Sequence, residues 1–494
     1  MPVPTARVAV AFSFAAKYST LALRTVGLLV LARLLPPEEF GVFATAAAIV
    51  TLVFVFAEFG LHSHLIQARR LTRALVAAAL GLAGVLNLVA ITLIVALAWL
   101  LPWTQTVPEA STVLLLLAVA AAAGPVALPV AAKLQRGMRF DRLLVIDFTR
   151  SMVGVGGSIA LVATGWGVVG LAWAAVAESV SGVALTLALG AGRRPVLPAL
   201  RGWGTALRFG GPLALVGGFR QAAEAGTTLL ISSLLGLAAA GIYARALTVK
   251  TLLNKAVVEA VSPVVLPVLA RETRQGRDLG GLYLRKIGAL TALHWPFFAV
   301  LALLAEPLVL LVLGPQWAAA APVVRVLALA GLFDPFGALS LKFFVALGAN
   351  GAFLRIQACV VAARLLAVGL LAMVSLEAAA IGLVAGAAVR AVGATLWLER
   401  RLGVSWAAIG RRVGQAALLT GFSVVGPAFL LLVTGWPADL AVGLAGGALG
   451  ALGWAAGLAV TRHELGGELL RAAAALRGRL AAWITFHHRL SWRR

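Results

Sequence analysis

Arg33-Leu-Leu-Pro-Pro-Glu-Glu-Phe-Gly-Val-Phe-Ala-Thr-Ala46 and Ser233-Leu-Leu-Gly-Leu-Ala-Ala-Ala-Gly-Ile-Tyr-Ala-Arg-Ala246 are two stretches that align without gaps at a shift of 200 residues. The shared positions are the identical Leu34, Leu35, Gly41, Ala44 and Ala46 and the conservatively replaced Val42 and Phe43. Each copy joins two long apolar stretches. The match therefore predicts a chain built from two similar halves.

Apolar residues dominate the whole chain of 494 residues, of which 62% are hydrophobic and 12% are charged. Soluble domains carry about 25% charged residues, so a soluble enzyme is excluded. Because a membrane-spanning helix needs about 20 apolar residues, the apolar runs predict fourteen helices, near 10–34, 41–61, 74–101, 111–134, 143–164, 166–190, 208–234, 238–268, 286–305, 319–346, 353–374, 376–399, 413–434 and 439–461. The predicted fold class is an all-α polytopic membrane protein.

Positive charge is concentrated in alternate connections between these helices. Of the 41 lysines and arginines, 29 lie in one set of connections and at the two ends of the chain, and the other connections contain none. The positive-inside rule then predicts that both termini are cytoplasmic. Tryptophans at the opposite helix ends, Trp103, Trp166, Trp317 and Trp436, fit interfacial aromatic belts. Most of the net charge of +23 thus reflects topology and contact with membrane lipids, not nucleic-acid binding.

The repeat and the basic segment near residues 191–208 predict the domain organisation. We expect six-helix lobes at 1–198 and 199–402, two further transmembrane helices within 403–461, and a basic amphipathic cytoplasmic tail at 462–494. Because six is an even number, both lobes would have the same orientation in the membrane, as parallel repeats do. Transporters built this way hold substrate between the lobes and rock them to alternate access.

Twelve cations fall within or at the edges of the predicted spans, where each costs about 2.5–3.5 kcal/mol at mid-membrane. Those near span ends, Arg33, Arg245, Arg325 and Lys342, are expected to extend toward the interface. The predicted substrate-binding residues are Lys17, Arg24, Arg150, Arg220, Lys250, Lys255 and Arg364. The predicted residues for proton or sodium coupling are Asp147, Glu224, Glu259 and Asp334.

Three pairs among these residues have the i,i+3 or i,i+4 spacing of ion pairs on one helix: Asp147–Arg150, Arg220–Glu224 and Lys255–Glu259. The remaining cations exceed the remaining acids, of which Glu178 is one. A cationic cavity suits an anionic substrate, since arginine grips phosphate oxygens bidentately. With apolar walls nearby, the implied ligand is amphipathic, with phosphate or pyrophosphate between a polar head and a lipid.

Several stretches resemble the bacterial polysaccharide biosynthesis and oligosaccharide flippase family (Wzx-type) over roughly residues 8–400. They are Leu31-Ala-Arg-Leu-Leu-Pro-Pro-Glu-Glu-Phe-Gly-Val-Phe43, Glu58-Phe-Gly-Leu61, Leu207-Arg-Phe-Gly-Gly-Pro-Leu213, Leu235-Gly…Gly241-Ile-Tyr-Ala-Arg-Ala246 and Ala305-Glu-Pro-Leu…Leu313-Gly-Pro-Gln-Trp-Ala318. The family belongs to a superfamily with multidrug exporters and the peptidoglycan lipid flippase.

The resemblance implies a V-shaped pair of six-helix bundles. These would move undecaprenyl-pyrophosphate-linked oligosaccharide, a unit of O-antigen, capsule or exopolysaccharide, from the cytoplasmic to the periplasmic leaflet of the bacterial inner membrane. Lys17 and Arg24 match first-helix cations typical of such flippases, and Glu224 is the nearest match to a polar residue in the seventh helix. It also implies a lipid-tail groove at helices thirteen and fourteen, and assembly partners such as a polysaccharide polymerase.

Two alternatives remain open, and a third is excluded. A small-molecule multidrug exporter would need uncompensated carboxylates for cationic drugs, and a peptidoglycan lipid flippase would share the pyrophosphate. A glycosyltransferase or polymerase would need a soluble domain or a long periplasmic loop, and no connection is long enough. The single cysteine, Cys359, and the absence of Cys/His metal spacing predict neither a disulfide nor a metal site. No cofactor is predicted.

Overall fold

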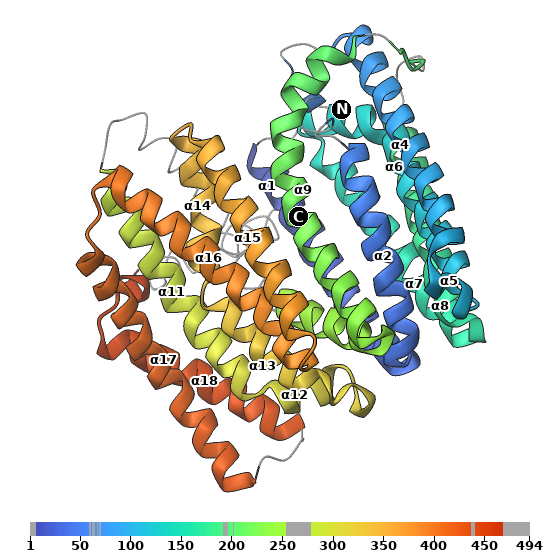
Figure 1. Ribbon diagram of the computed structural model, residues 1–494. Helices are drawn as coiled ribbons and strands as arrows, with labels where there is room; N and C mark the ends of the chain where they lie inside the picture. The colour runs from blue at the N-terminus through green and yellow to red at the C-terminus, as the bar shows by residue number, and fades with distance from the viewer. Residues whose placement is uncertain are drawn as a thin grey trace, which may run out of the picture. The chain divides into compact units, whose positions relative to one another are not determined.

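The chain forms a helical membrane protein (Figure 1). The computed structural model describes residues 6–58, 61, 65–66, 68, 71–190, 196–200, 202–252, 278–435 and 440–467. Its labelled elements are α1 (Ala6–Leu34), α2 (Pro37–Glu58), α4 (Arg73–Leu100), α5 (Pro102–Thr106), α6 (Ala110–Arg136), α7 (Phe140–Leu161), η1 (Val162–Trp166), α8 (Gly167–Leu189), α9 (Trp203–Leu235), α11 (Leu279–Leu303), α12 (Ala305–Val312), η2 (Pro315–Trp317), α13 (Ala320–Gly331), α14 (Asp334–Ala346), α15 (Asn350–Leu371), α16 (Leu376–Leu402), α17 (Trp406–Thr434) and α18 (Leu440–Val460). Residues 237–252 are also helical and are called the 237–252 helix.

The predicted fold class is confirmed: the described chain is all-helical, with about fourteen long helices. Thirteen of the predicted stretches coincide with one long helix each, although the stretch 238–268 is described only as far as residue 252. Among the described residues, nine helical stretches are long and apolar enough to cross a membrane. One of them, Phe140–Leu189, has 50 residues and would extend about 75 Å if straight, so it must supply two crossings.

The break within that stretch is a π-helical turn, η1. Gly165 has φ 89° and Gly167 has φ 50°, a region that side chains other than glycine rarely adopt. The chain therefore reverses here, and α7 and α8 pack against each other.

The predicted helix 319–346 is the exception, because the structure divides it into α13 and α14. Proline has no N–H and its ring clashes with the carbonyl four residues earlier. Pro335 lies in the first turn of α14, and the chain before it tightens: Leu332 N donates to Leu329 O and Phe333 N donates to Ala330 O, both at 3.1 Å. The single long helix was therefore a wrong prediction, and the Asp-Pro pair was its signal.

By packing, the chain divides into two compact units. The first comprises Met1–Leu253, Val312–Val323 and Leu354–Val389, and the second comprises Asn254–Leu311, Val324–Phe353 and Arg390–Arg494. In the second unit, α11 packs against α17 and α18, and Trp454 Nε1 donates to the carbonyl oxygen of Ala292 at 2.9 Å. The six-helix lobes inferred from the repeat stay a prediction.

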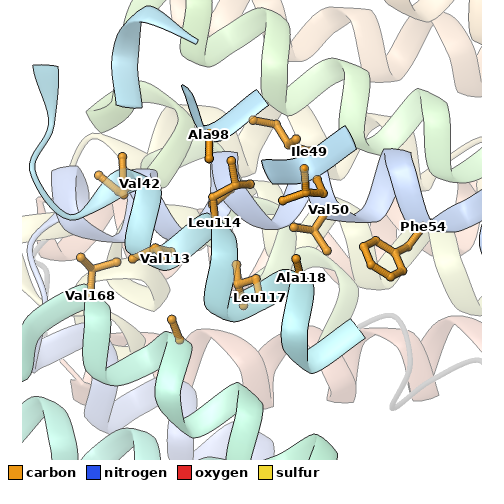
Figure 2. Close-up of a cluster of buried hydrophobic side chains, with 14 of the residues drawn as sticks. Val42, Ile49, Val50, Phe54, Ala98, Val113, Leu114, Leu117, Ala118 and Val168 are labelled. Atoms are coloured by element: carbon orange, nitrogen blue, oxygen red, sulfur yellow. The ribbon is translucent and has the colours of Figure 1, made fainter. Parts of the chain in front are cut away.

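The core of the first unit surrounds α2, which packs against α4, α6, α8 and α9. Figure 2 shows one cluster of buried side chains there, with Val42 and Ile49 of α2 beside Leu114 and Leu117 of α6. Their spacing of three or seven residues places each pair on one face of its helix. Since lipid tails are as apolar as these side chains, close packing is what holds such helices together.

The two copies of the repeat meet in the first unit, where α2 crosses the 237–252 helix. A Cβ atom on Gly41 would overlap the carbonyl oxygen of Leu237, and one on Gly241 would overlap that of Pro37. Leu237 stands 200 residues after Pro37, as Gly241 does after Gly41. The crossing is therefore a pseudo-twofold contact between equivalent glycines and equivalent carbonyls, and we call it the glycine crossing.

Arg245, four residues after Gly241, packs against two aromatic rings. The Cζ atom of Arg245 lies 3.6 Å from the ring centroid of Phe40 and 5.6 Å from that of Trp317. Trp317 Nε1 donates to Ala32 O at 2.7 Å. Arg245 is only 5% exposed and Trp317 is fully buried. The predictions that Arg245 extends toward the interface and that Trp317 lies in an aromatic belt were wrong, because both side chains pack within the protein.

Candidate functional site

Charged residues from three helices of the first unit form one cluster. Glu178 of α8 accepts a hydrogen bond at its Oε1 from Arg24 Nη2 at 3.2 Å, and Arg150 Nε lies 3.5 Å from the same oxygen. Arg150 and Glu178 stand near the middle of α7 and α8. Asp147, one turn before Arg150, is close enough to interact electrostatically with both arginines. We call Arg24, Asp147, Arg150 and Glu178 the charged cluster.

Two glycines make room for the charged cluster. A Cβ on Gly154 would overlap the carboxylate of Glu178, and one on Gly182 would overlap the side chain of Arg150. In each case the glycine lies on the helix facing the charged residue. The sequence thus builds space for these long side chains between α7 and α8.

The two arginines of the charged cluster have N–H donors that their described contacts with Glu178 do not use. A guanidinium carries five N–H donors, and the described contacts of Arg24 and Arg150 with Glu178 use few of them. The side chains of Arg24 and Arg150 are 52% and 43% exposed. Charges at mid-helix in a membrane face water, a partner or a ligand, so this is a place where an anion can be received.

The balance of charge here differs from the prediction. Arg150 forms its ion pair with Glu178, not with Asp147 as the i,i+3 spacing suggested. With Asp147 nearby, two arginines face two acids. Sequence reasoning noted Glu178 only as a buried acid, because its partners lie on other helices. The nearest signal was an acid at mid-span with a glycine four residues later.

A second group, the Arg364 group, joins α9, the 237–252 helix and α15. Arg364 is 5% exposed, and it donates from Nε to Thr227 Oγ1 at 2.8 Å and from Nη2 to Tyr243 Oη at 3.3 Å. A Cβ on Gly386 of α16 would press on the Arg364 side chain. Sequence reasoning missed Thr227 and Tyr243, although a tyrosine hydroxyl inside an apolar helix was a usable signal.

The pair Arg220–Glu224, one turn before Thr227 on α9, has its predicted ion pair. Arg220 Nη1 lies 3.1 Å from Glu224 Oε1, and both side chains are exposed to a large degree. Arg325, expected to extend toward the interface, pairs with Glu306 at 3.1 Å in the second unit.

The remaining predicted residues are scattered or undescribed. Lys250 is buried in the 237–252 helix. Asp334 begins α14 in the second unit, directly before Pro335. Lys255, Glu259, the side chain of Lys17 and most of the predicted tail, from residue 468 onward, lie outside the described residues.

An apolar cavity of about 1120 Å³ lies beside the Arg364 group. It is lined by α2, α4, α9 and α15, including Gly226 and Leu365, which are the sequence neighbours of Thr227 and Arg364. Thr45, Ser232 and Ser233 are its polar lining residues. Such a volume matches or exceeds that of most small-molecule sites.

Comparison with known proteins places this arrangement among membrane transport folds. A family model described as polysaccharide biosynthesis protein matches residues 30–322. A solved structure of the lipid II flippase MurJ in an inward closed conformation superposes with a TM-score of 0.72 at 11% identity, covering 92% of this chain and 99% of that chain. Curated protein sequences give no match.

Two further structures share the fold at a lower TM-score. An inward-facing multidrug resistance MATE family transporter of the MOP superfamily gives 0.54 at 17% identity, covering 79% of this chain and 94% of that chain. A MOP superfamily transporter from Pyrococcus furiosus, described as having a binding pocket of reverse polarity, gives 0.53 at 16% identity, covering 80% and 95%. At such low identities the comparison establishes the fold.

Proposed function

The chain belongs to the polysaccharide biosynthesis protein family, and from that premise we propose that it is a flippase for undecaprenyl-pyrophosphate-linked oligosaccharide. It moves a unit of O-antigen, capsule or exopolysaccharide from the cytoplasmic to the periplasmic leaflet by alternating access. The matched family and a fold similar to that of a lipid II flippase support this proposal.

The observation that carries the proposal is the charged cluster. Arg24 and Arg150 share one carboxylate oxygen and retain free donors at mid-helix. Arginine and phosphate form bidentate, charge-assisted hydrogen bonds. An arriving pyrophosphate therefore replaces Glu178 as the partner of the two guanidiniums. While the site is empty, Glu178 holds them in place.

This exchange also suggests a coupling route. Once the arginines turn to phosphate, the Glu178 carboxylate stands without its partners at mid-helix, where an unpaired charge is expensive. Uptake of a proton by Glu178 or Asp147 removes that cost. Sodium binding at Asp147, Glu224, Glu259 or Asp334 is the other route. The flippase needs no cofactor for either.

The lipid part of the substrate fits the apolar cavity beside the Arg364 group. Its walls come from α2, α9 and α15, and Arg220 on α9 offers an exposed cation one to two turns away in sequence from Gly226. Buried Arg364 positions Thr227 and Tyr243 instead of gripping phosphate itself. We assign Lys17, Lys250 and Lys255 to supporting positive charge around the substrate.

The setting follows from the same proposal. The protein lies in the bacterial inner membrane with both termini cytoplasmic, as the basic connections favour. Its partners are membrane lipids, the lipid-linked oligosaccharide, and assembly proteins such as a polysaccharide polymerase. The peptidoglycan lipid flippase and the multidrug exporter remain the competing functions, and the transport assay separates them.

The test uses the full chain reconstituted in proteoliposomes with a fluorescent undecaprenyl-pyrophosphate oligosaccharide. Loss of one arginine–phosphate contact should cost about 1.5–3 kcal/mol, so Arg24→Ala and Arg150→Ala should each slow translocation roughly tenfold or more. Arg325→Ala is the matched control, since Arg325 forms an ion pair of similar exposure in the second unit; its transport should stay within about twofold of the parent rate.

Normal translocation in both cluster variants would overturn the proposed site. Selective transport of lipid II or of a cationic dye, with none of the oligosaccharide lipid, would favour the competing functions. Glu178→Gln adds a readout of coupling: if Glu178 takes up the proton, this variant loses the dependence of transport on an imposed pH gradient.

A further inference from the structure

A second cavity, of about 700 Å³, lies in the first unit away from both polar groups. Its walls are α4, α6, the end of α8 and the segment 196–198. Leu80, Val126, Val130 and Leu187 are among its apolar lining residues. Val126 and Leu187 are also exposed, so the cavity opens on the outer surface of these helices.

The sequence explains why this space is open. Pro125 and Pro129 both stand inside α6 and line the cavity. Prolines in a helix remove hydrogen bonds and bend it. The opposite wall is fixed, because Ala199 N donates to Ala77 O at 2.8 Å, and Gly81 leaves room for the Ala199 carbonyl. The cavity is therefore part of the fold.

The mouth of the cavity is cationic. Arg73, the first residue of α4, and Lys133, in the last turn of α6, both line it. Arg73 adds its charge to the positive end of the α4 dipole, so an anion bound at the mouth would be stabilised. No aspartate or glutamate is among the described residues that line this cavity.

The inner end of the cavity reaches Asn87, in the middle of α4. Asn87 lines the cavity and is 7% exposed; its Nδ2 donates to Ala83 O at 2.7 Å, and its Oδ1 accepts from no described donor. Asn87 marks the depth to which the cavity extends along α4. Fourteen residues separate Arg73 from Asn87, about 21 Å along the helix, which reaches from a head group to the bilayer interior.

We propose that this cavity binds one anionic phospholipid of the surrounding membrane. Its phosphate lies between Arg73 and Lys133, and its acyl chain runs along α4 and α6 past the two prolines. Basic pockets at the cytoplasmic ends of transmembrane helices suit such head groups. A free phosphate would leave the apolar walls uncovered. The site is separate from the charged cluster, so it does not depend on the proposed transport function.

The test measures lipid binding by the full chain, without transport substrate. Purified protein in neutral detergent is titrated with phosphatidylglycerol or phosphatidylcholine and followed by native mass spectrometry. We expect one tightly bound phosphatidylglycerol per chain. Each cation should contribute about fivefold to affinity. Arg73→Gln/Lys133→Gln should therefore weaken binding about 25-fold, whereas Arg400→Gln/Arg401→Gln, an equal loss of charge at the end of α16, should leave it unchanged.

A second variant tests the apolar part of the site. Gly84 lines the cavity and a Cβ there meets nothing within 4 Å, so Gly84→Leu fills the space without disturbing the backbone. Gly124→Leu is the matched control on α6, where a Cβ also meets nothing within 4 Å and the residue lies outside the cavity lining. Gly84→Leu should abolish tight phosphatidylglycerol binding and Gly124→Leu should retain it.

Three results would overturn the proposal. They are equal binding of phosphatidylcholine, unchanged phosphatidylglycerol binding in both the double glutamine variant and Gly84→Leu, and displacement of phosphatidylglycerol by equimolar undecaprenyl phosphate. The last would make the cavity a site for the substrate carrier. Because lipid binding and translocation are measured separately, failure of one proposal leaves the other standing.

Discussion

The two copies of the repeat, 33–46 and 233–246, fold alike at the backbone and differ in their side chains. Gly41 and Gly241 make reciprocal contacts with carbonyls in the glycine crossing. Four residues beyond each glycine the copies diverge: Thr45 lines the large apolar cavity, whereas Arg245 is buried against Phe40 and Trp317. The shared residues therefore build the contact, and the unshared ones give each side its own chemistry.

The largest effect is expected from the glycines that the copies share. Gly41→Ala and Gly241→Ala each drive a Cβ into a backbone carbonyl, which cannot turn aside as a side chain can. Each should lower the free energy of unfolding by about 3 kcal/mol, at the upper end for overpacked sites. The measurement is unfolding in mixed micelles titrated with SDS. Gly156→Ala on α7, where a Cβ meets nothing within 4 Å, is the control.

A marked difference between the losses in Gly41→Ala and Gly241→Ala would contradict the pseudo-twofold crossing, because it would mean that the two glycines contribute unequally to stability. Similar losses in both variants, with little change in Gly156→Ala, would support the equivalence of the two glycine contacts.

A smaller effect is expected from Arg245, where the copies differ most. Its guanidinium stacks on Phe40 while Nε and Nη2 make no hydrogen bond to any described atom. A desolvated cation–π contact contributes about 2 kcal/mol. Arg245→Ala should therefore reduce the free energy of unfolding by about that amount. Arg245→Met, which keeps the bulk and removes the charge, should lose nearly as much, because the cation–π contact is absent from both variants.

A much smaller loss in Arg245→Met than in Arg245→Ala would assign the stabilisation to packing rather than to the charge. No loss in Arg245→Ala would contradict the stacking argument.

The smallest effect is expected at Thr45, the counterpart of Arg245. Its hydroxyl is buried and has no hydrogen-bond partner among the described atoms. Since an unsatisfied buried hydroxyl is costly, Thr45→Val should raise the free energy of unfolding by about 1 kcal/mol. The same SDS titration measures it, with Thr248→Val as the contrast, because Thr248 Oγ1 donates to Ala244 O at 2.7 Å. Destabilisation by Thr45→Val would mean that the hydroxyl has a partner in the membrane.

Much of the fold follows from local sequence. The predicted stretch 74–101 agrees with α4 and the stretch 376–399 with α16 to within three residues, because apolar length alone decides whether a segment can cross a bilayer. The division of the predicted helix 319–346 depended on one proline, and proline inside apolar helices is also tolerated, as in α6.

The candidate site was less accessible to sequence reasoning. Pairing by spacing finds partners on one helix, and so it found Arg220–Glu224 and missed Arg150–Glu178. The burial of Arg245 was missed for a related reason: the aromatic rings around it come from positions 40 and 317. Interactions between helices require the packing, which hydropathy does not encode.

The glycine crossing also determines how early this part of the protein can assemble. Gly41 cannot meet the Leu237 carbonyl until the ribosome has made the next 196 residues, up to Leu237 itself, which takes about 10–40 s at roughly 5–20 residues per second. During that interval the glycine face of α2 must rest against lipid or a chaperone. The step that closes the crossing is therefore late, and its substitutions should lower the yield of inserted protein more than they change any helix.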